Sequence, residues 1–152
     1  MPRSIASVWL HVVWATKHRK CDINPVWQSK LYGTLVDIAE KNGCGIDAVG
    51  GVRDHVHCLL SFSRTIAISD LLRELKSRSA RWIRDTVPDM TPFQWQEGYG
   101  VFSVSYSLLA VVDLYIRNQE THHNRFSFNY EMDFLAKKHN LEWESDGYED
   151  AE

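Results

Sequence analysis

The alternating sequence of residues 54–62 constrains this chain more than any other segment. Successive side chains of a strand point to opposite faces, and the same-face apolar residues here are Val56, Cys58 and Leu60. His55 and His57 then share the other face, where two imidazoles can converge on one metal ion. A His-x-His pair alone is unspecific, so the alternative is two polar residues on an open sheet face.

Capping and turn signals divide the chain into strands and helices. A β-branched and aromatic run predicts a strand at 8–15, and Asn24-Pro25 predicts a helix reaching about residue 42. The other expected elements are strands at 45–52 and 54–62, a helix at 69–86, a strand at 99–105, and helices at 108–122 and 128–139. The first six elements match the split βαβ pattern, which predicts a ferredoxin-like (RRM-like) α/β, or α+β, fold with an antiparallel sheet and helices on one face.

Length and composition favour one folded domain, at residues 1–141, followed by an acidic tail at 142–152. The 152 residues include 12% aromatic side chains, enough to form a core, and we expect the tail to be solvated and mobile. No apolar run approaches the ~18 residues that a membrane-spanning helix needs. The three cysteines lack metal-binding or disulfide spacing, so we expect a cytoplasmic protein.

A second candidate feature is Tyr115-Ile116-Arg117-Asn118-Gln119 in the penultimate predicted helix. Tyr115 and Gln119 are separated by four residues and therefore stack on one helix face, which also carries apolar residues. Both side chains should point inward, toward the sheet or a partner. Tyrosines are common in cores, but a buried glutamine amide must find hydrogen-bond partners.

Together the two features describe a reaction centre. His55, His57 and the amide oxygen of Gln119 would give a metal three neutral ligands and leave positions open for phosphate oxygens. Imidazole with oxygen suits Mn²⁺, and oxygen-rich sites suit Mg²⁺. Tyr115 would be a nucleophile aimed at the bound phosphate. The chain has no GxxxxGK[ST] loop, so nothing points to ATP.

These motifs resemble a known family. Asp54-His55-Val56-His57 is similar to the His-hydrophobic-His (HUH) motif, and Tyr115-x-x-x-Gln119 to its single-tyrosine partner motif. Leu75-Lys76-Ser77 and the segment YGVFSVS at 99–105 also resemble family sequence. The chain thus resembles, over residues 8–141, the single-tyrosine (Y1) HUH transposases of the smallest bacterial insertion sequences and the REP-associated tyrosine transposases.

The resemblance implies a function as well as a fold. Such proteins are homodimers with composite active sites, in which one subunit supplies the histidine pair and the other the tyrosine. They cleave single-stranded DNA beside hairpins through a 5′-phosphotyrosine intermediate and later rejoin the strands. Carried over, the implied metal ligands are His55, His57 and Gln119, and the implied nucleophile is Tyr115.

The charge distribution suggests where DNA could bind. Residues 1–84 carry a net charge of +6, whereas residues 85–152 carry −9. Candidate phosphate contacts are Lys17, Arg19, Arg73, Lys76, Arg81 and Arg84. A solvated helix face explains most of these cations equally well. His122 falls near the Tyr115 face and could assist the reaction.

Two other functions stay open on the sequence alone. A nucleic-acid-binding module without catalysis would need exposed aromatic side chains on the sheet. A metal phosphohydrolase would use water as its nucleophile, and Tyr115 would then be dispensable.

Overall fold

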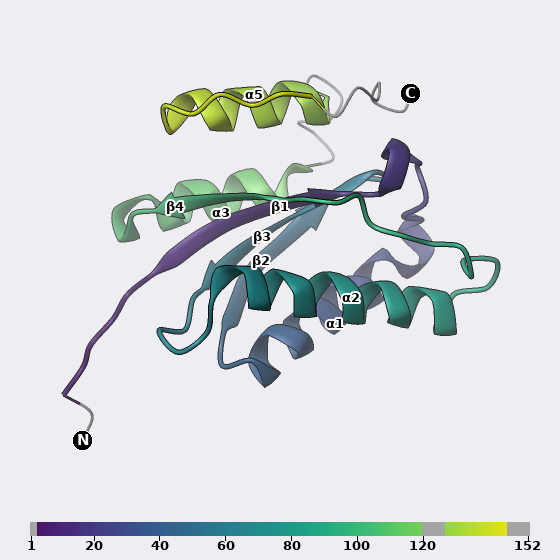
Figure 1. The fold of residues 1–152 in the computed structure, drawn as a ribbon, viewed down its shortest axis with the longest axis horizontal. Helices are drawn as coiled ribbons and strands as arrows, with labels where there is room; N and C mark the ends of the chain where they lie inside the picture. The colour runs from purple at the N-terminus through teal and green to yellow at the C-terminus, as the bar shows by residue number, and fades with distance from the viewer. Residues whose placement is uncertain (1–2, 120–126, 146–152) are drawn as a thin grey trace.

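The computed structural model describes residues 3–119 and 127–145, which form a four-stranded antiparallel sheet with helices on both faces (Figure 1). The strands are β1 (Trp9–Ala15), β2 (Gly45–Gly51), β3 (His55–Ser61) and β4 (Gly100–Val104). Their order, β2-β3-β1-β4, is that of the predicted ferredoxin-like fold. No helix in the described part of the chain is both long and apolar enough to span a membrane.

One face of the sheet packs on α1 (Pro25–Lys41) and α2 (Ile68–Thr86), as predicted. The Asn24 side chain accepts a hydrogen bond of 2.9 Å from the Val26 amide, and Pro25 begins the helix, so the predicted start of α1 is confirmed. The alternating residues of β1 and β3 on this face join the main core: Leu10, Val12, Trp14, Val56, Cys58 and Leu60. This packing fixes which residues face the opposite side.

The opposite face lies under α3 (Leu109–Arg117) and α5 (Phe128–Lys138) (Figure 1). Two smaller apolar clusters hold these helices in place, one joining α5 to β1 and β4 and one joining α3 to β2 and β3. The helix predicted at 108–122 begins as a short 3-10 turn at Tyr106–Leu108 and ends at Arg117 with Asn118 as its C-cap, so the predicted single helix to residue 122 is wrong. The sheet surface that carries the histidines is therefore covered.

Gly50 of β2 allows α3 to lie directly on the sheet. A Cβ atom at this position would come within 1.7 Å of the carbonyl oxygen of Ile116. Since Ile116 is next to Tyr115 in the chain, this close approach of two backbones sets the height of the tyrosine above the sheet.

The chain remains packed beyond the end of α5. The Trp143 ring lies 6.3 Å from the Phe128 ring and packs on the apolar cluster between α5 and the sheet. Contact with the domain thus extends past residue 141, where the sequence suggests the acidic tail starts. Residues 146–152 of that tail lie outside the described residues.

Candidate active site

Strand β3 places the imidazoles of His55 and His57 side by side beneath α3 and α5. Both are fully buried, and their rings lie 5.2 Å apart. The predicted pairing on one face is thus present. The alternative of two polar residues on an open sheet face is wrong, because helices cover that face.

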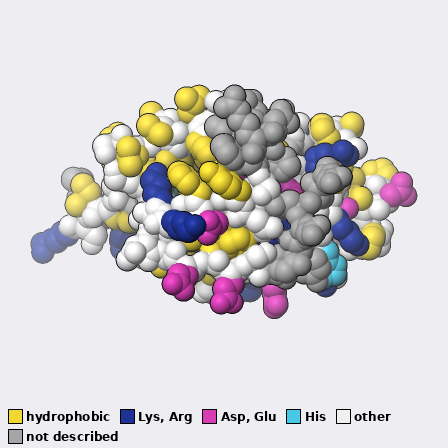
Figure 2. Space-filling view, turned by 90° about the horizontal axis from the view of Figure 1, so that it is seen from above, with side chains coloured by type: hydrophobic (Ala, Val, Ile, Leu, Met, Phe, Trp, Pro, Cys, Tyr) yellow, Lys and Arg dark blue, Asp and Glu magenta, His cyan; other side chains and the backbone are white. Residues whose placement is uncertain are grey.

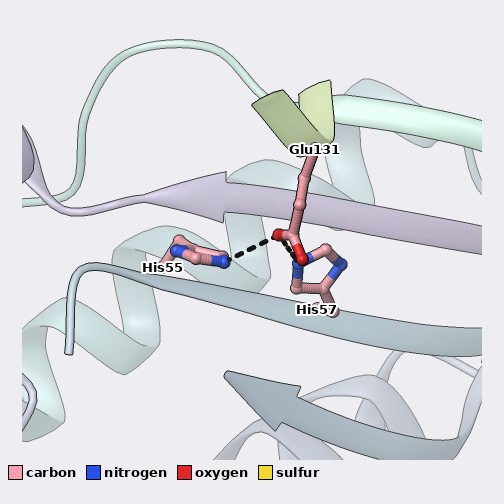
Figure 3. Close-up of side chains that lie close together, drawn as sticks. All are labelled: His55, His57 and Glu131. Carbon is pink, nitrogen blue, oxygen red and sulfur yellow. Dashed lines mark hydrogen bonds and ion pairs between the residues drawn. The ribbon is translucent and has the colours of Figure 1, made fainter. Parts of the chain in front are cut away.

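A carboxylate that sequence reasoning missed, Glu131 of α5, joins the two imidazoles (Figure 3). Its Oε2 atom lies 3.1 Å from Nε2 of His55 and 3.1 Å from Nε2 of His57. Glu131 is only 2% exposed. The sequence did carry one signal for it. Glu131 lies on the apolar side of α5, between Phe128 and Leu135, where a carboxylate is seldom buried unless it is paired.

Tyr115 reaches the same carboxylate from α3. Its hydroxyl donates a hydrogen bond of 2.9 Å to Oε1 of Glu131, and its ring lies 5.8 Å from that of His57. The resemblance implies a composite site with the tyrosine from a second subunit. Here Tyr115 faces the histidine pair of its own chain, so one chain holds all of these groups.

Gln119 is buried at 1% exposure but does not join the cluster by a hydrogen bond. Its amide oxygen and nitrogen have no hydrogen-bond partner among the described residues. The carboxylate of Glu131, not this amide, contacts both imidazoles. The metal-ligand role of Gln119 therefore stays a prediction.

Each imidazole is held from behind through its Nδ1 atom. Nδ1 of His55 donates to Oδ1 of Asp54 at 2.7 Å. Nδ1 of His57 is hydrogen-bonded at 2.7 Å to Nε2 of His11, a buried residue of β1. His11 also touches the Tyr115 ring edge-on at 6.0 Å. These partners aim both Nε2 atoms at Glu131, as outer partners of metal-binding histidines do.

The electrostatics of the cluster favour a negative carboxylate between positive or polar groups. Burial opposes the charged form of His55, but its hydrogen bonds to Asp54 and Glu131 and their charges raise its pKa to about 9. Burial raises the pKa of Glu131, yet the hydrogen bonds from His55 and His57 outweigh it and leave that pKa far below its usual value. Burial and the nearby Glu131 raise the pKa of Tyr115.

This donor set fits a divalent cation. One atom each from His55, His57 and Glu131 lie within 4.8 Å of one another, and all three residues are buried. Two imidazoles with a carboxylate are ligands that first-row divalent ions accept. A cation would replace the hydrogen bonds that now link each imidazole to the carboxylate, and it would explain why these polar atoms gather in an apolar layer.

The predicted DNA-contact residues fall into different environments. Arg19 is only 2% exposed and lies 3.8 Å from the centre of the Phe128 ring, so it fixes α5 instead of facing solvent. Arg73 and Arg81 are exposed and paired with acids on α2. The other three cations contact the segment before β4: Lys17, Lys76 and Arg84. His122 lies outside the described residues.

The fold and the cluster together define a class of protein. A ferredoxin-like sheet with a buried His-x-His pair on a central strand, faced by a tyrosine from a covering helix, is the arrangement expected of an HUH transposase. Comparison with known proteins points the same way.

Residues 4–119 match the sequence profile of the family described as "Transposase IS200 like". The chain is 31% identical over 114 residues to the ISDra2 transposase TnpA of Deinococcus radiodurans, covering 72% of this chain and 81% of that protein. The chain therefore belongs to the IS200-like family of transposases, the single-tyrosine (Y1) HUH transposases.

Solved structures agree on the fold. A crystal structure from Deinococcus radiodurans R1, described as a transposase, superposes with a TM-score of 0.63 at 30% identity, covering 78% of this chain and 95% of that chain. A REP-associated tyrosine transposase bound to a REP hairpin gives a TM-score of 0.60 at 13% identity and covers 96% of this chain and 90% of that chain. At that identity the second likeness concerns the fold alone.

Proposed function

We propose that this transposase cleaves and rejoins single-stranded DNA at hairpin-bearing ends, with Tyr115 as the nucleophile. The observation that carries the proposal is the meeting of Tyr115 and both imidazoles on one carboxylate of the same chain. In the reaction, the Tyr115 oxygen forms a bond to phosphorus while the bond to the 3′ oxygen breaks. This leaves a 5′-phosphotyrosine and a free 3′ hydroxyl, and the reverse exchange rejoins strands.

The proposed metal ligands are His55, His57 and Glu131, with the buried amide of Gln119 as a further ligand. Mg²⁺ or Mn²⁺ bound there would polarise the phosphate and stabilise developing charge. The residues behind the ligands keep them oriented. Tyr115 must lose a proton as its oxygen bonds to phosphorus, and in the resting state its hydroxyl donates a hydrogen bond to Glu131.

A non-catalytic binding module fits the structure less well. Single strands bind such sheets through exposed aromatic side chains, whereas α3 and α5 cover this sheet and leave the histidines buried. A water-using phosphohydrolase would have no need of a tyrosine beside the ligands.

We also propose that the protein works as a homodimer in the cytoplasm. Hydrophobic side chains gather on the face formed by α3 and α5 (Figure 2). The exposed members, between 44% and 63% accessible, are Leu108, Val111, Leu114, Tyr130 and Phe134. An apolar patch of this kind is typical of an interface between subunits.

The test uses labelled single-stranded DNA that contains the short palindromes flanking the gene. With Mn²⁺ or Mg²⁺, the protein should form a covalent DNA adduct that survives denaturing electrophoresis. Chelation should abolish the adduct. Cleavage without any adduct would instead support hydrolysis by water and overturn the proposed mechanism.

A further inference from the structure

Three cations from distant parts of the chain meet on residues 93–98, the segment that leads into β4. Nζ of Lys17 donates a hydrogen bond of 2.8 Å to Oε1 of Gln94. Nζ of Lys76 donates to the carbonyl oxygens of Gln96 and Gly98, at 2.6 and 2.8 Å. A guanidinium nitrogen of Arg84 donates a hydrogen bond of 3.1 Å to the carbonyl oxygen of Phe93. We call these three cations and this segment the cationic seam.

Among the described residues, the acceptors of these hydrogen bonds are all neutral oxygens, so none of them is a carboxylate that neutralises the cation it contacts. The outward-facing arginines of α2 differ, since each is paired with a carboxylate nearby on the same helix. Those pairs are Arg73 with Asp70, Arg78 with Glu74, and Arg81 with Asp85. Burial lowers the pKa of Lys76, and the charge of Glu97, an acid within the segment itself, opposes this effect.

Grooves lie on both sides of the segment. The larger, of about 540 Å³, runs between α2 and residues 94–99 and is lined by Lys76, Arg73 and Arg84 with no acidic side chain. The smaller, of about 260 Å³, is lined by Lys17, His18 and Lys20 with one acid, Asp22. Phosphates favour such a surface, since each neutralised phosphate releases counterions.

Gly98 and Tyr99 line the larger groove and also a third cavity, of about 250 Å³. Phe128 lines this third cavity too, together with two acids, Glu97 and Glu144. The Phe128 ring lies 5.1 Å from the His55 ring. Tyr99, at the junction, is 43% exposed and offers a face on which a base can stack.

We propose that the cationic seam binds the phosphodiester backbone of the single strand whose scissile phosphate enters the active site, with Tyr99 stacking on a base between the two. This inference rests on the proposed function. It selects Lys17, Lys76 and Arg84 from the six cations that the sequence suggested.

The test measures binding of a fluorescein-labelled oligothymidine of about 15 nucleotides to the full chain carrying Tyr115→Phe, across a range of salt concentrations. Lys17→Gln and Lys76→Gln should each lower the slope of log affinity against log salt by about 0.7. Tyr99→Leu should weaken binding about fivefold or more without changing the slope. Lys76→Arg should restore the slope, because it keeps the positive charge. This variant therefore distinguishes the effect of the charge from that of the lysine's hydrogen bonds to the segment.

The matched control is Arg78→Gln, which removes the same charge from α2 at a residue paired with Glu74. It should leave the slope unchanged. If Arg78→Gln lowers the slope as much as the lysine variants do, or if both lysine variants leave the slope unchanged, the seam does not bind the DNA backbone and the proposal is wrong. Adduct formation by the same lysine variants with Tyr115 restored, at saturating DNA, is a separate readout. If Tyr115 forms no adduct while the slopes shift as stated, the proposed mechanism fails and the seam stands.

Discussion

The Tyr115 hydroxyl and the Glu131 carboxylate are hydrogen-bonded at 2.9 Å, and this contact ties the α3 helix to the α5 helix above the histidine pair. The other carboxylate oxygen lies 3.1 Å from both imidazoles. Glu131 thus contacts Tyr115, His55 and His57, three of the four residues assigned to the proposed reaction.

Tyr115→Phe should abolish the covalent DNA adduct, because in the proposed mechanism the phenolic oxygen is the atom that forms the bond to phosphorus. Denaturing gel analysis of labelled single-stranded DNA checks this outcome. Tyr106→Phe is the control, since Tyr106 is 75% exposed and its adduct yield should equal that of the unmodified chain. An adduct that persists in Tyr115→Phe would assign the nucleophile to another residue.

Glu131→Gln should reduce Mn²⁺ affinity on the order of 10–100-fold or more, because an anionic ligand is replaced by a neutral amide. Titration calorimetry on the metal-free chain measures the effect. Gln119→Leu distinguishes the two candidate ligands. Loss of affinity in Gln119→Leu together with normal affinity in Glu131→Gln would restore the amide as the third ligand and exclude the carboxylate.

His11→Leu should weaken Mn²⁺ binding about 10–100-fold, since it removes the partner of Nδ1 of His57. His11→Gln, which keeps a polar group there, should recover part of the affinity. Phe102→Leu is the matched control, because Phe102 packs 6.3 Å from the His11 ring without a hydrogen bond to the ligands. If His11→Leu and Phe102→Leu lower the Mn²⁺ affinity equally, His11 acts only through packing and not through its hydrogen bond to His57.

The metal-free chain should lose stability as the pH rises through the pKa of His55, which is raised from 6.5 to about 9. A raised pKa means that the folded state holds the proton more tightly than the unfolded state does. The stability that protonated His55 contributes is therefore full below about pH 6.5 and is lost above about pH 9. Urea unfolding with a chelator should show a decrease on the order of 1–3 kcal/mol relative to His55→Gln. Mn²⁺ affinity should increase over the same window, because the ligand must release its proton. A pH-independent affinity between these limits would contradict the assignment.

Gly50→Ala should lower the free energy of unfolding by about 1–3 kcal/mol, because the added Cβ clashes with the Ile116 carbonyl oxygen. Displacement of α3 should also reduce adduct yield. Gly33→Ala provides the contrast, since nothing lies within 4 Å of its Cβ position on the exposed side of α1. That substitution should stabilise the helix by about 0.5–1 kcal/mol.

The sequence predicted the parts of the site that lie in regular, local patterns. Alternation placed His55 and His57 on one face of a strand, as the structure shows. Four-residue spacing predicted Tyr115 and Gln119 on one face of a helix, but α3 ends at Arg117, so Tyr115 lies on this helix and Gln119 follows its end. The order of strands and helices predicted the sheet. These features follow from backbone periodicity and need no knowledge of long-range packing.

Contacts between distant segments could not be predicted in the same way. Glu131 is 76 residues from His55, and only the packing of α5 over the sheet brings them together. Arg19 lies in a basic stretch that is typical of a surface turn, yet its guanidinium stacks on the Phe128 ring and is buried. The three seam cations also depend on the path of residues 93–98, which has no periodic pattern.

The position of Glu131 has a consequence for protein synthesis. A ribosome completes the histidine strand first, the tyrosine helix much later, and the carboxylate last of these groups. A nascent chain that has folded its sheet but not yet released α5 has two imidazoles exposed and no acid to join them. We therefore expect the complete metal site to form only after α5 has been synthesised and has packed on the sheet.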